Sequence, residues 1–139
     1  MPLPDTGKSE GRNRMTKKEI DEFETVQGQL DSLHGEITTL VKKNPNDLLN
    51  KFKLGLINSV LKRANAFLGK KWRPFGSFEQ FDEDAMPSTS DVLMVISQYL
   101  SALEKLRADN IAQKGLRWIW LCSDSADDIR TAQPKKLES

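Results

Sequence analysis

The sequence predicts a mainly α-helical fold: three long helices in a bundle-like core, with a structured aromatic crossover between the second and third helices. Helix-starting signals precede three segments in which apolar residues recur every three or four positions. Most of the large aromatic residues outside these segments crowd into one aperiodic stretch between the last two. A chain of 139 residues is long enough for one core and short for two domains.

The first helix is expected to begin at a capping box formed by Thr16 and Glu19. Its apolar residues form a seam suited to packing along another helix or a second copy of the chain. The seam contains Phe23, Val26, Leu30, Leu33, Ile37 and Leu40. Gly28 and Gly35 lie on the opposite side, where they either permit a second close contact or weaken the helix locally. Residues 1–15 are rich in proline, glycine and charge, so they are expected to form a disordered arm.

The second helix is expected to follow residues 44–47, whose sequence Asn-Pro-Asn-Asp both ends one helix and starts another. Helical projection places its polar and small residues on one narrow stripe. The stripe contains Lys51, Gly55, Asn58, Lys62, Asn65 and Gly69. The remaining surface holds enough apolar residues to bury the helix against two neighbours, among them Phe52, Leu56 and Val60. Gly69 is suited to close the helix.

The crossover spans residues 70–87 and contains Trp72 and three phenylalanines, which are costly to leave in water. A single helical turn is expected near residues 77–81. The third helix starts at residues 88–91 and is expected to fray near residues 113–115. Alternation at residues 116–121 and a turn at 123–128 predict a small hairpin that closes at 129–131, with a short fourth helix as the alternative. The domain thus covers residues 16–131, and residues 132–139 are expected to be a mobile tail.

The composition argues against a membrane protein and against a secreted one. No run of apolar residues approaches the length of a membrane span, and the first residues lack the pattern of a signal peptide. The single cysteine, Cys122, excludes an internal disulfide and a cysteine metal cluster. A cytoplasmic protein is therefore expected.

No motif predicts catalysis or a cofactor. His34 is the only histidine and has no neighbouring nucleophile motif, and both nucleotide-binding glycine fingerprints are absent. Clustered oxygen ligands occur only at Asp82, Glu83 and Asp84, where ordinary solvated acids are the simpler interpretation. We therefore expect no enzyme, no metal and no cofactor, and keep a metal-dependent hydrolase at this acidic triplet as a minor alternative.

Several polar residues lie on or beside expected apolar faces, where unpaired burial is expensive. Arg63 and Arg107 are predicted to take carboxylates from the acidic triplet and so tie the crossover to the helices. Tyr99 and Asn110 are predicted to complete the hydrogen bonds. The alternative is a pocket in which the arginines meet an anion or a partner's carboxylate. The predicted partner-binding or structural network is Arg63, Trp72, Arg73, Asp82, Glu83, Asp84, Tyr99, Arg107 and Asn110.

Charge is arranged in blocks. Residues 48–78 carry seven bases and no acid, whereas residues 79–104 carry six acids and no base, and the whole chain has a formal net charge of +1. The leading prediction is a non-enzymatic interaction or regulatory module that binds a protein partner and forms a homodimer through the first helix. The alternative is nucleic-acid binding, which the near-neutral net charge disfavours. Its basic and aromatic patch would be Lys62, Lys70, Lys71, Trp72, Arg73 and Arg117.

Overall fold

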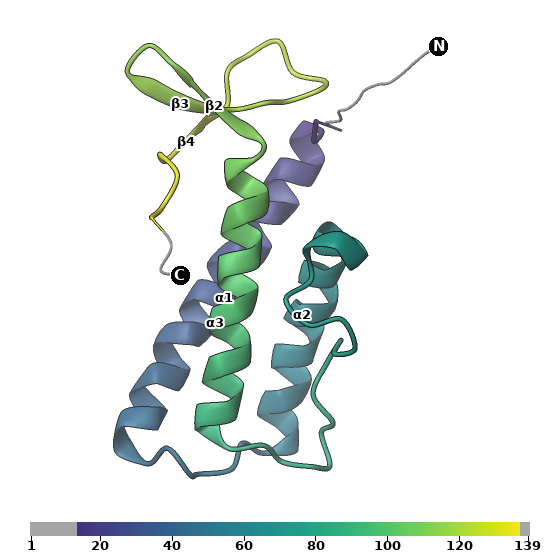
Figure 1. The fold of residues 1–139 in the computed structure, drawn as a ribbon, viewed down its shortest axis with the longest axis vertical. Coiled ribbons are helices and arrows are strands. Elements are labelled where there is room, and N and C mark those ends of the chain that lie inside the picture. Colours follow the sequence, from purple (N-terminus) through teal and green to yellow (C-terminus); the bar gives the residue numbers. More distant parts are fainter. Residues whose placement is uncertain (1–13, 137–139) are drawn as a thin grey trace. The chain divides into compact units, whose positions relative to one another are not determined.

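The computed structural model describes residues 14–136 and is mainly helical, with a small antiparallel sheet near the C-terminus (Figure 1). The elements are α1 (Lys17–Lys43), α2 (Lys51–Trp72), α3 (Thr89–Ala108), β2 (Ile111–Lys114), β3 (Arg117–Trp120) and β4 (Arg130–Thr131). The chain forms two compact units. The larger is Phe23–Leu103, and the smaller combines the chain up to Glu22 with Glu104–Ser139.

The larger unit contains most of the three helices. In Figure 1, α2 and α3 both run in the direction opposite to α1, so the crossover returns the chain along α2. It was predicted at residues 70–87 and spans residues 73–88 in the structure. Apolar residues at helical spacing are buried on all three helices, as the sequence predicts. They include Phe23, Val26, Leu30, Ile37, Leu54, Ile57, Leu61, Leu68, Val92, Ile96 and Leu103. The Phe23 and Phe67 rings meet edge to face, with centroids 5.5 Å apart.

The predicted capping box at the start of α1 is confirmed. The Thr16 hydroxyl accepts the Glu19 N–H at 3.1 Å, and the Glu19 carboxylate accepts the Thr16 N–H at 2.9 Å. The predicted arm lies outside the described residues except at Arg14 and Met15. Met15 is buried and forms an isolated parallel bridge with Cys122.

The start of α2 differs from the prediction. Its N-cap is Asn50, whose side chain accepts the Lys53 N–H at 2.9 Å, so residues 44–49 form a connection and not a first helical turn. This connection bonds to the start of α3. Leu49 N–H donates to Pro87 O and Thr89 N–H donates to Asp47 O, and these pairings fix the backbone of 44–49 away from helical geometry.

Gly69 interrupts α2 at the position where the sequence predicts its end, but the helix continues for a final turn at residues 70–72. Its φ of 59° and ψ of −168° are a conformation that residues other than glycine rarely adopt. The single helical turn expected near residues 77–81 is absent, because the backbone there bonds to α2 side chains.

The C-terminal prediction of strands is confirmed in part. The described residues hold a three-stranded antiparallel sheet in the order β2-β3-β4, with Ile111 opposite Trp120 and Trp118 opposite Thr131. The third helix ends at Ala108, so residues 111–114 form a strand where a fraying helix was predicted. Gly115, with φ of 64°, occupies the first loop position of the tight β2–β3 hairpin, where a positive φ is required.

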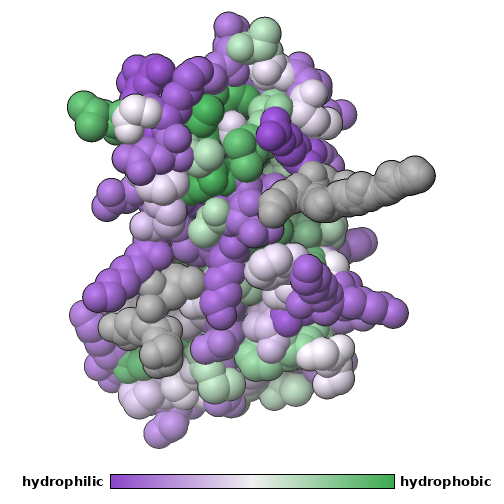
Figure 2. All heavy atoms as spheres, turned by 45° about the horizontal axis from the view of Figure 1, so that its top comes forward, coloured by the Kyte–Doolittle hydropathy of each residue, from purple (hydrophilic) through white to green (hydrophobic). Residues whose placement is uncertain are grey.

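The smaller unit, which contains the sheet, exposes apolar side chains. Figure 2, which turns the sheet end of Figure 1 toward the viewer, shows a hydrophobic patch among hydrophilic side chains. Leu116 at the hairpin tip is fully exposed, while Ile119 and Leu121 are half-buried. No helix in the described part of the chain has the length and apolar character needed to cross a bilayer.

Candidate functional site

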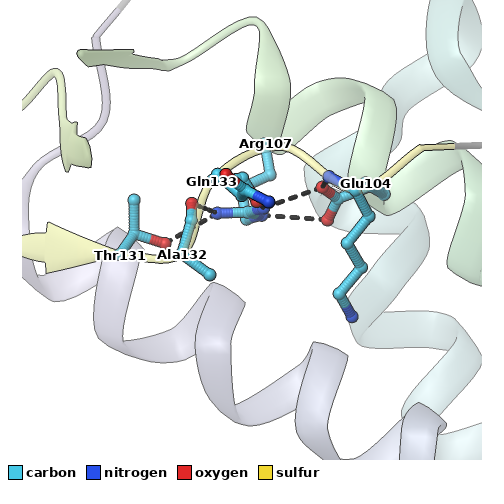
Figure 3. Close-up of polar contacts among 6 residues, drawn as sticks. Glu104, Arg107, Thr131, Ala132 and Gln133 are labelled. Atoms are coloured by element: carbon cyan, nitrogen blue, oxygen red, sulfur yellow. Dashed lines mark hydrogen bonds and ion pairs between the residues drawn. The ribbon is translucent and has the colours of Figure 1, made fainter. Parts of the chain in front are cut away.

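Arg107 does not bind the acidic triplet, contrary to the prediction. Its guanidinium pairs with Glu104 of the same helix, with Nη2 2.7 Å from Oε2 and Nε 2.9 Å from Oε1 (Figure 3). Both side chains are only 4% exposed. A carboxylate three residues away on the same helix reaches the guanidinium without any ordering of a loop, so the nearer acid is preferred over the triplet.

The remaining donors of Arg107 hold the C-terminal segment (Figure 3). Nη1 donates to Thr131 Oγ1 at 2.7 Å and to Ala132 O at 2.9 Å, and Nη2 donates to Gln133 O at 3.0 Å. Lys135 N–H donates to Glu104 Oε2 at 2.9 Å. The predicted mobile tail is therefore anchored through residue 135. Because the Arg107 guanidinium donates its hydrogen bonds to groups of its own unit, its role is structural and it is not available to bind an anion.

Tyr99 and Asn110 also have partners other than those predicted. Tyr99 donates its hydroxyl proton to Asn65 Oδ1 at 2.8 Å, and Asn110 Nδ2 donates to Leu106 O at 2.9 Å at the end of α3. Burial raises the pKa of the Tyr99 phenol, and the Asn65 hydrogen bond opposes that shift in part. Both residues therefore complete the core and not an arginine–carboxylate network.

The acidic triplet is a turn. Asp82 Oδ1 accepts the Asp84 N–H at 3.0 Å, and Lys51 Nζ lies 3.6 Å from Asp84 Oδ1 with both side chains exposed. The described residues contain no group of three or more His, Cys, Asp or Glu side chains arranged to hold a metal ion. His34, half-buried on α1, shares a hydrogen bond of 3.0 Å with the Ser97 hydroxyl of α3.

Two asparagines on the predicted polar stripe of α2 anchor the crossover, a role that the sequence prediction missed. Asn58 donates from Nδ2 to Phe81 O at 2.9 Å and accepts the Phe81 N–H at 2.8 Å. Asn65 donates to Glu79 O at 3.0 Å. Both asparagines and Phe81 are buried. A carboxamide pairs with one N–H and one C=O at once, so it suits a buried backbone without regular structure. The sequence feature that could have indicated this role is the pair of asparagines seven residues apart on one face of the helix, next to an aromatic loop.

The predicted basic patch is divided. Lys62, Lys70 and Lys71 are exposed on α2, and the Lys71 ammonium lies 5.5 Å from the centroid of the Trp72 ring. Arg73 Nη1 lies 3.5 Å from Glu79 Oε2. Arg117 belongs to the smaller unit, where its guanidinium is 3.8 Å from the carboxylate of Asp128. Arg117 is therefore engaged by an acid within its own unit.

A groove runs between α1 and α2 on the side of α2 away from the crossover. Its volume is about 580 Å³, and Arg63 Nη1 donates to Gln29 Oε1 at 2.9 Å across it. Its lining combines small and apolar residues with polar ones: Glu24, Thr25, Gly28, Gln29, Ser32, Leu33, Leu56, Ser59, Val60 and Arg63. No atom lies within 4 Å of a Cβ placed on Gly28, so the space above this glycine is open.

Two large apolar side chains stand beside this groove. Leu56 is 53% exposed, and Phe52, one turn earlier on α2, is 73% exposed. The prediction that Phe52 and Leu56 help to bury α2 against its two neighbours is therefore wrong. We call the groove with Phe52 and Leu56 the open face.

The helices that border the open face differ in charge. Within the larger unit α1 exposes three acids, Glu24, Asp31 and Glu36, before two bases in its last turn, Lys42 and Lys43, whereas α2 carries six bases and no acid. The seam of α1 predicted for self-association is for the most part buried within the chain, at Phe23, Val26, Leu30 and Ile37. The opposite side of α1, which includes Gly28, Ser32 and Gly35, is accessible.

Comparison of the chain with known protein families, with curated proteins and with solved structures returns no match.

Proposed function

We propose that this protein is a non-enzymatic self-association module whose open face binds the open face of a second copy. The observation that carries the proposal is the exposure of Phe52 and Leu56 beside an open groove. Large apolar side chains that stand next to each other in water, rimmed by polar residues, are typical of interaction surfaces. A bundle-like packing of the three helices would hold this face rigid. The single Cys122 supports a reducing, cytoplasmic setting.

A two-fold axis parallel to the helices supplies complementary shapes. It would place α1 of each copy against α2 of the other, so that Phe52 and Leu56 of one copy face the small residues Gly28, Ser32 and Gly35 of its partner. Each contact occurs twice in such an interface. Full burial of one Phe or Leu side chain contributes about 2 kcal/mol, so four such side chains supply a favourable term of the size that association requires.

The same arrangement supplies complementary charges. The three exposed acids of α1 would meet bases of α2 from the second copy, whereas the other two-fold arrangement would place the bases of the two α2 helices together. Charge thus favours one orientation and also favours a second copy over an unrelated helix of arbitrary charge. The crossover is a poorer docking surface, because Phe81 packs inward and its backbone is bonded to α2.

Light scattering coupled to size exclusion over a range of concentrations tests the proposal. The wild-type chain is expected to move from monomer to dimer as concentration rises. Phe52→Ser is expected to weaken this association at least tenfold, since it removes an exposed anchor without affecting the core. Met94→Ser removes a similarly exposed apolar residue on α3 and is the matched control, expected to associate like wild type. A wild-type chain that stays monomeric at every concentration would refute the proposal.

A further inference from the structure

A second pocket lies between α2 and the crossover, separate from the open face. It has a volume of about 320 Å³. Its lining is almost entirely polar: Lys62, Asn65, Ala66, Arg73, Glu79 and Gln80. Two of these side chains are cationic and one is anionic, so the pocket carries a net positive charge.

The Arg73 guanidinium is poorly satisfied in this pocket. Its side chain is only 20% exposed, and its Nε is buried without a hydrogen-bond partner among the described residues. The Glu79 carboxylate stands 3.5 Å from Nη1, too far for a strong hydrogen bond, and the Glu79 side chain is 72% exposed. The buried Nε is closed to solvent, so a ligand would reach the guanidinium through its terminal nitrogens. Of these, Nη1 has the long contact with the exposed Glu79 carboxylate, so the site favours an oxyanion that pairs better than Glu79 does.

The wall of the pocket is fixed before any ligand arrives. Asn65 accepts the Tyr99 hydroxyl and donates to Glu79 O, so the backbone on which Glu79 and Gln80 sit is tied to α2 and α3. The Lys62 ammonium and the Gln80 amide are exposed at the rim. The preceding segment adds Lys70 and Lys71 without any acid between residues 48 and 78, which raises the local positive potential.

We propose that this pocket binds the phosphate group of a small molecule. Arg73 would take two of the phosphate oxygens along one edge of its guanidinium, and Lys62 would pair with a third. The exposed Glu79 carboxylate would swing into solvent as the phosphate replaces it. A phosphate uses these separate donors better than a carboxylate does, because it offers three free oxygens in different directions.

Titration of the full-length chain with inorganic phosphate, followed by NMR at constant ionic strength, tests the proposal. Saturable shifts are expected at the side-chain amides of Asn65 and Gln80. Lys62→Met should weaken binding about fivefold, whereas Glu79→Gln should strengthen it about fivefold because the competing carboxylate is gone. Lys53→Met, an exposed α2 lysine outside the pocket lining, is the matched control and should leave the affinity unchanged.

The opposite effects of Lys62→Met and Glu79→Gln separate binding from folding, since both side chains are exposed and neither supports the core. Shifts that do not saturate, or an equal loss in Lys53→Met, would show only general attraction to charge and would overturn the proposal. A short single-stranded oligonucleotide distinguishes the source of the phosphate. Binding of the oligonucleotide without any binding of inorganic phosphate would also overturn it.

Discussion

One face of α2 carries polar side chains that are buried, whereas the opposite face carries apolar side chains that are exposed. Asn58 and Asn65 lie beneath the crossover, while Phe52 and Leu56 stand in solvent beside the groove. The difference shows that burial along this helix follows the hydrogen-bonding needs of an irregular segment as much as hydropathy. The aromatic crossover needs partners for its backbone, and only the polar face provides them.

The face of α2 beneath the crossover, here called the covered face, holds an irregular segment with neutral amides. The smaller unit holds its irregular C-terminal segment with the Arg107–Glu104 ion pair. Breaking that ion pair has the largest expected effect. Arg107→Met should lower the free energy of unfolding by about 4 kcal/mol, because the buried Glu104 carboxylate would lose its ion pair with Arg107. Denaturant unfolding measures this, with the exposed neighbour Lys105→Met as the control. Equal stability of the two variants would show that the Arg107–Glu104 pair does not anchor the C-terminal segment.

The second largest effect on stability is expected from removing the hydrogen bonds that the covered face of α2 makes to the crossover. Asn58→Ala should cost about 3 kcal/mol, since the Phe81 N–H and C=O would both lose their partner while buried. Ser59→Ala on the adjacent exposed position should change stability by less than about 0.5 kcal/mol. The same denaturant experiment compares the two variants. A small effect of Asn58→Ala would mean that the crossover is held by its aromatic contacts alone.

The local parts of this structure were predictable from the sequence. The Thr16–Glu19 capping box and the interruption of α2 at Gly69 depend on residues within one helical turn, so the local sequence identifies them directly. The apolar positions of the three helices also follow from spacing alone. The strands of the sheet were found only in part, because β2 lacks the alternation that marks β3.

The missed features have three different causes. Asn50 caps α2 in place of the earlier asparagine because residues 44–49 bond to residues 87–90, and no local signal distinguishes the two. The prediction that Arg107 pairs with the acidic triplet failed because Glu104 lies one turn away on the same helix. This spacing is visible in the sequence. The open face was missed because hydropathy alone placed Phe52 and Leu56 in the core.

The Tyr99 hydroxyl connects the covered face to α3, with a smaller expected effect. Tyr99→Phe should cost about 1 kcal/mol through loss of the hydrogen bond to Asn65. The raised pKa of Tyr99 adds a pH dependence: its contribution to stability is complete below the ordinary phenol pKa of about 10 and falls as pH rises through the folded-state value. Unfolding measured on both sides of that pH should show this decline in wild type, and a decline of the same size in Tyr99→Phe would contradict the assignment.

A substitution in the open face is expected to have the smallest effect on the free energy of unfolding, and it should raise this free energy instead of lowering it. Gly28→Ala should raise the free energy of unfolding by about 0.8 kcal/mol, because alanine favours the helix and its methyl group meets no atom within 4 Å. Gly69→Ala is the contrasting variant and should destabilise, since its φ of 59° suits glycine. Thermal unfolding of both, in dilute solution, measures the difference. Destabilisation by Gly28→Ala would mean that this face is closed.

Sedimentation equilibrium of wild type and Gly28→Gln tests most directly whether the open face pairs two copies of the chain. The longer side chain fits the single chain, because the space above Gly28 is open, but it fills the groove that a second copy would enter. Wild type is expected to reach twice the mass of one chain as concentration rises, while Gly28→Gln remains folded and sediments as a single chain. Equal association of the two proteins would contradict the assignment of the interface to this face.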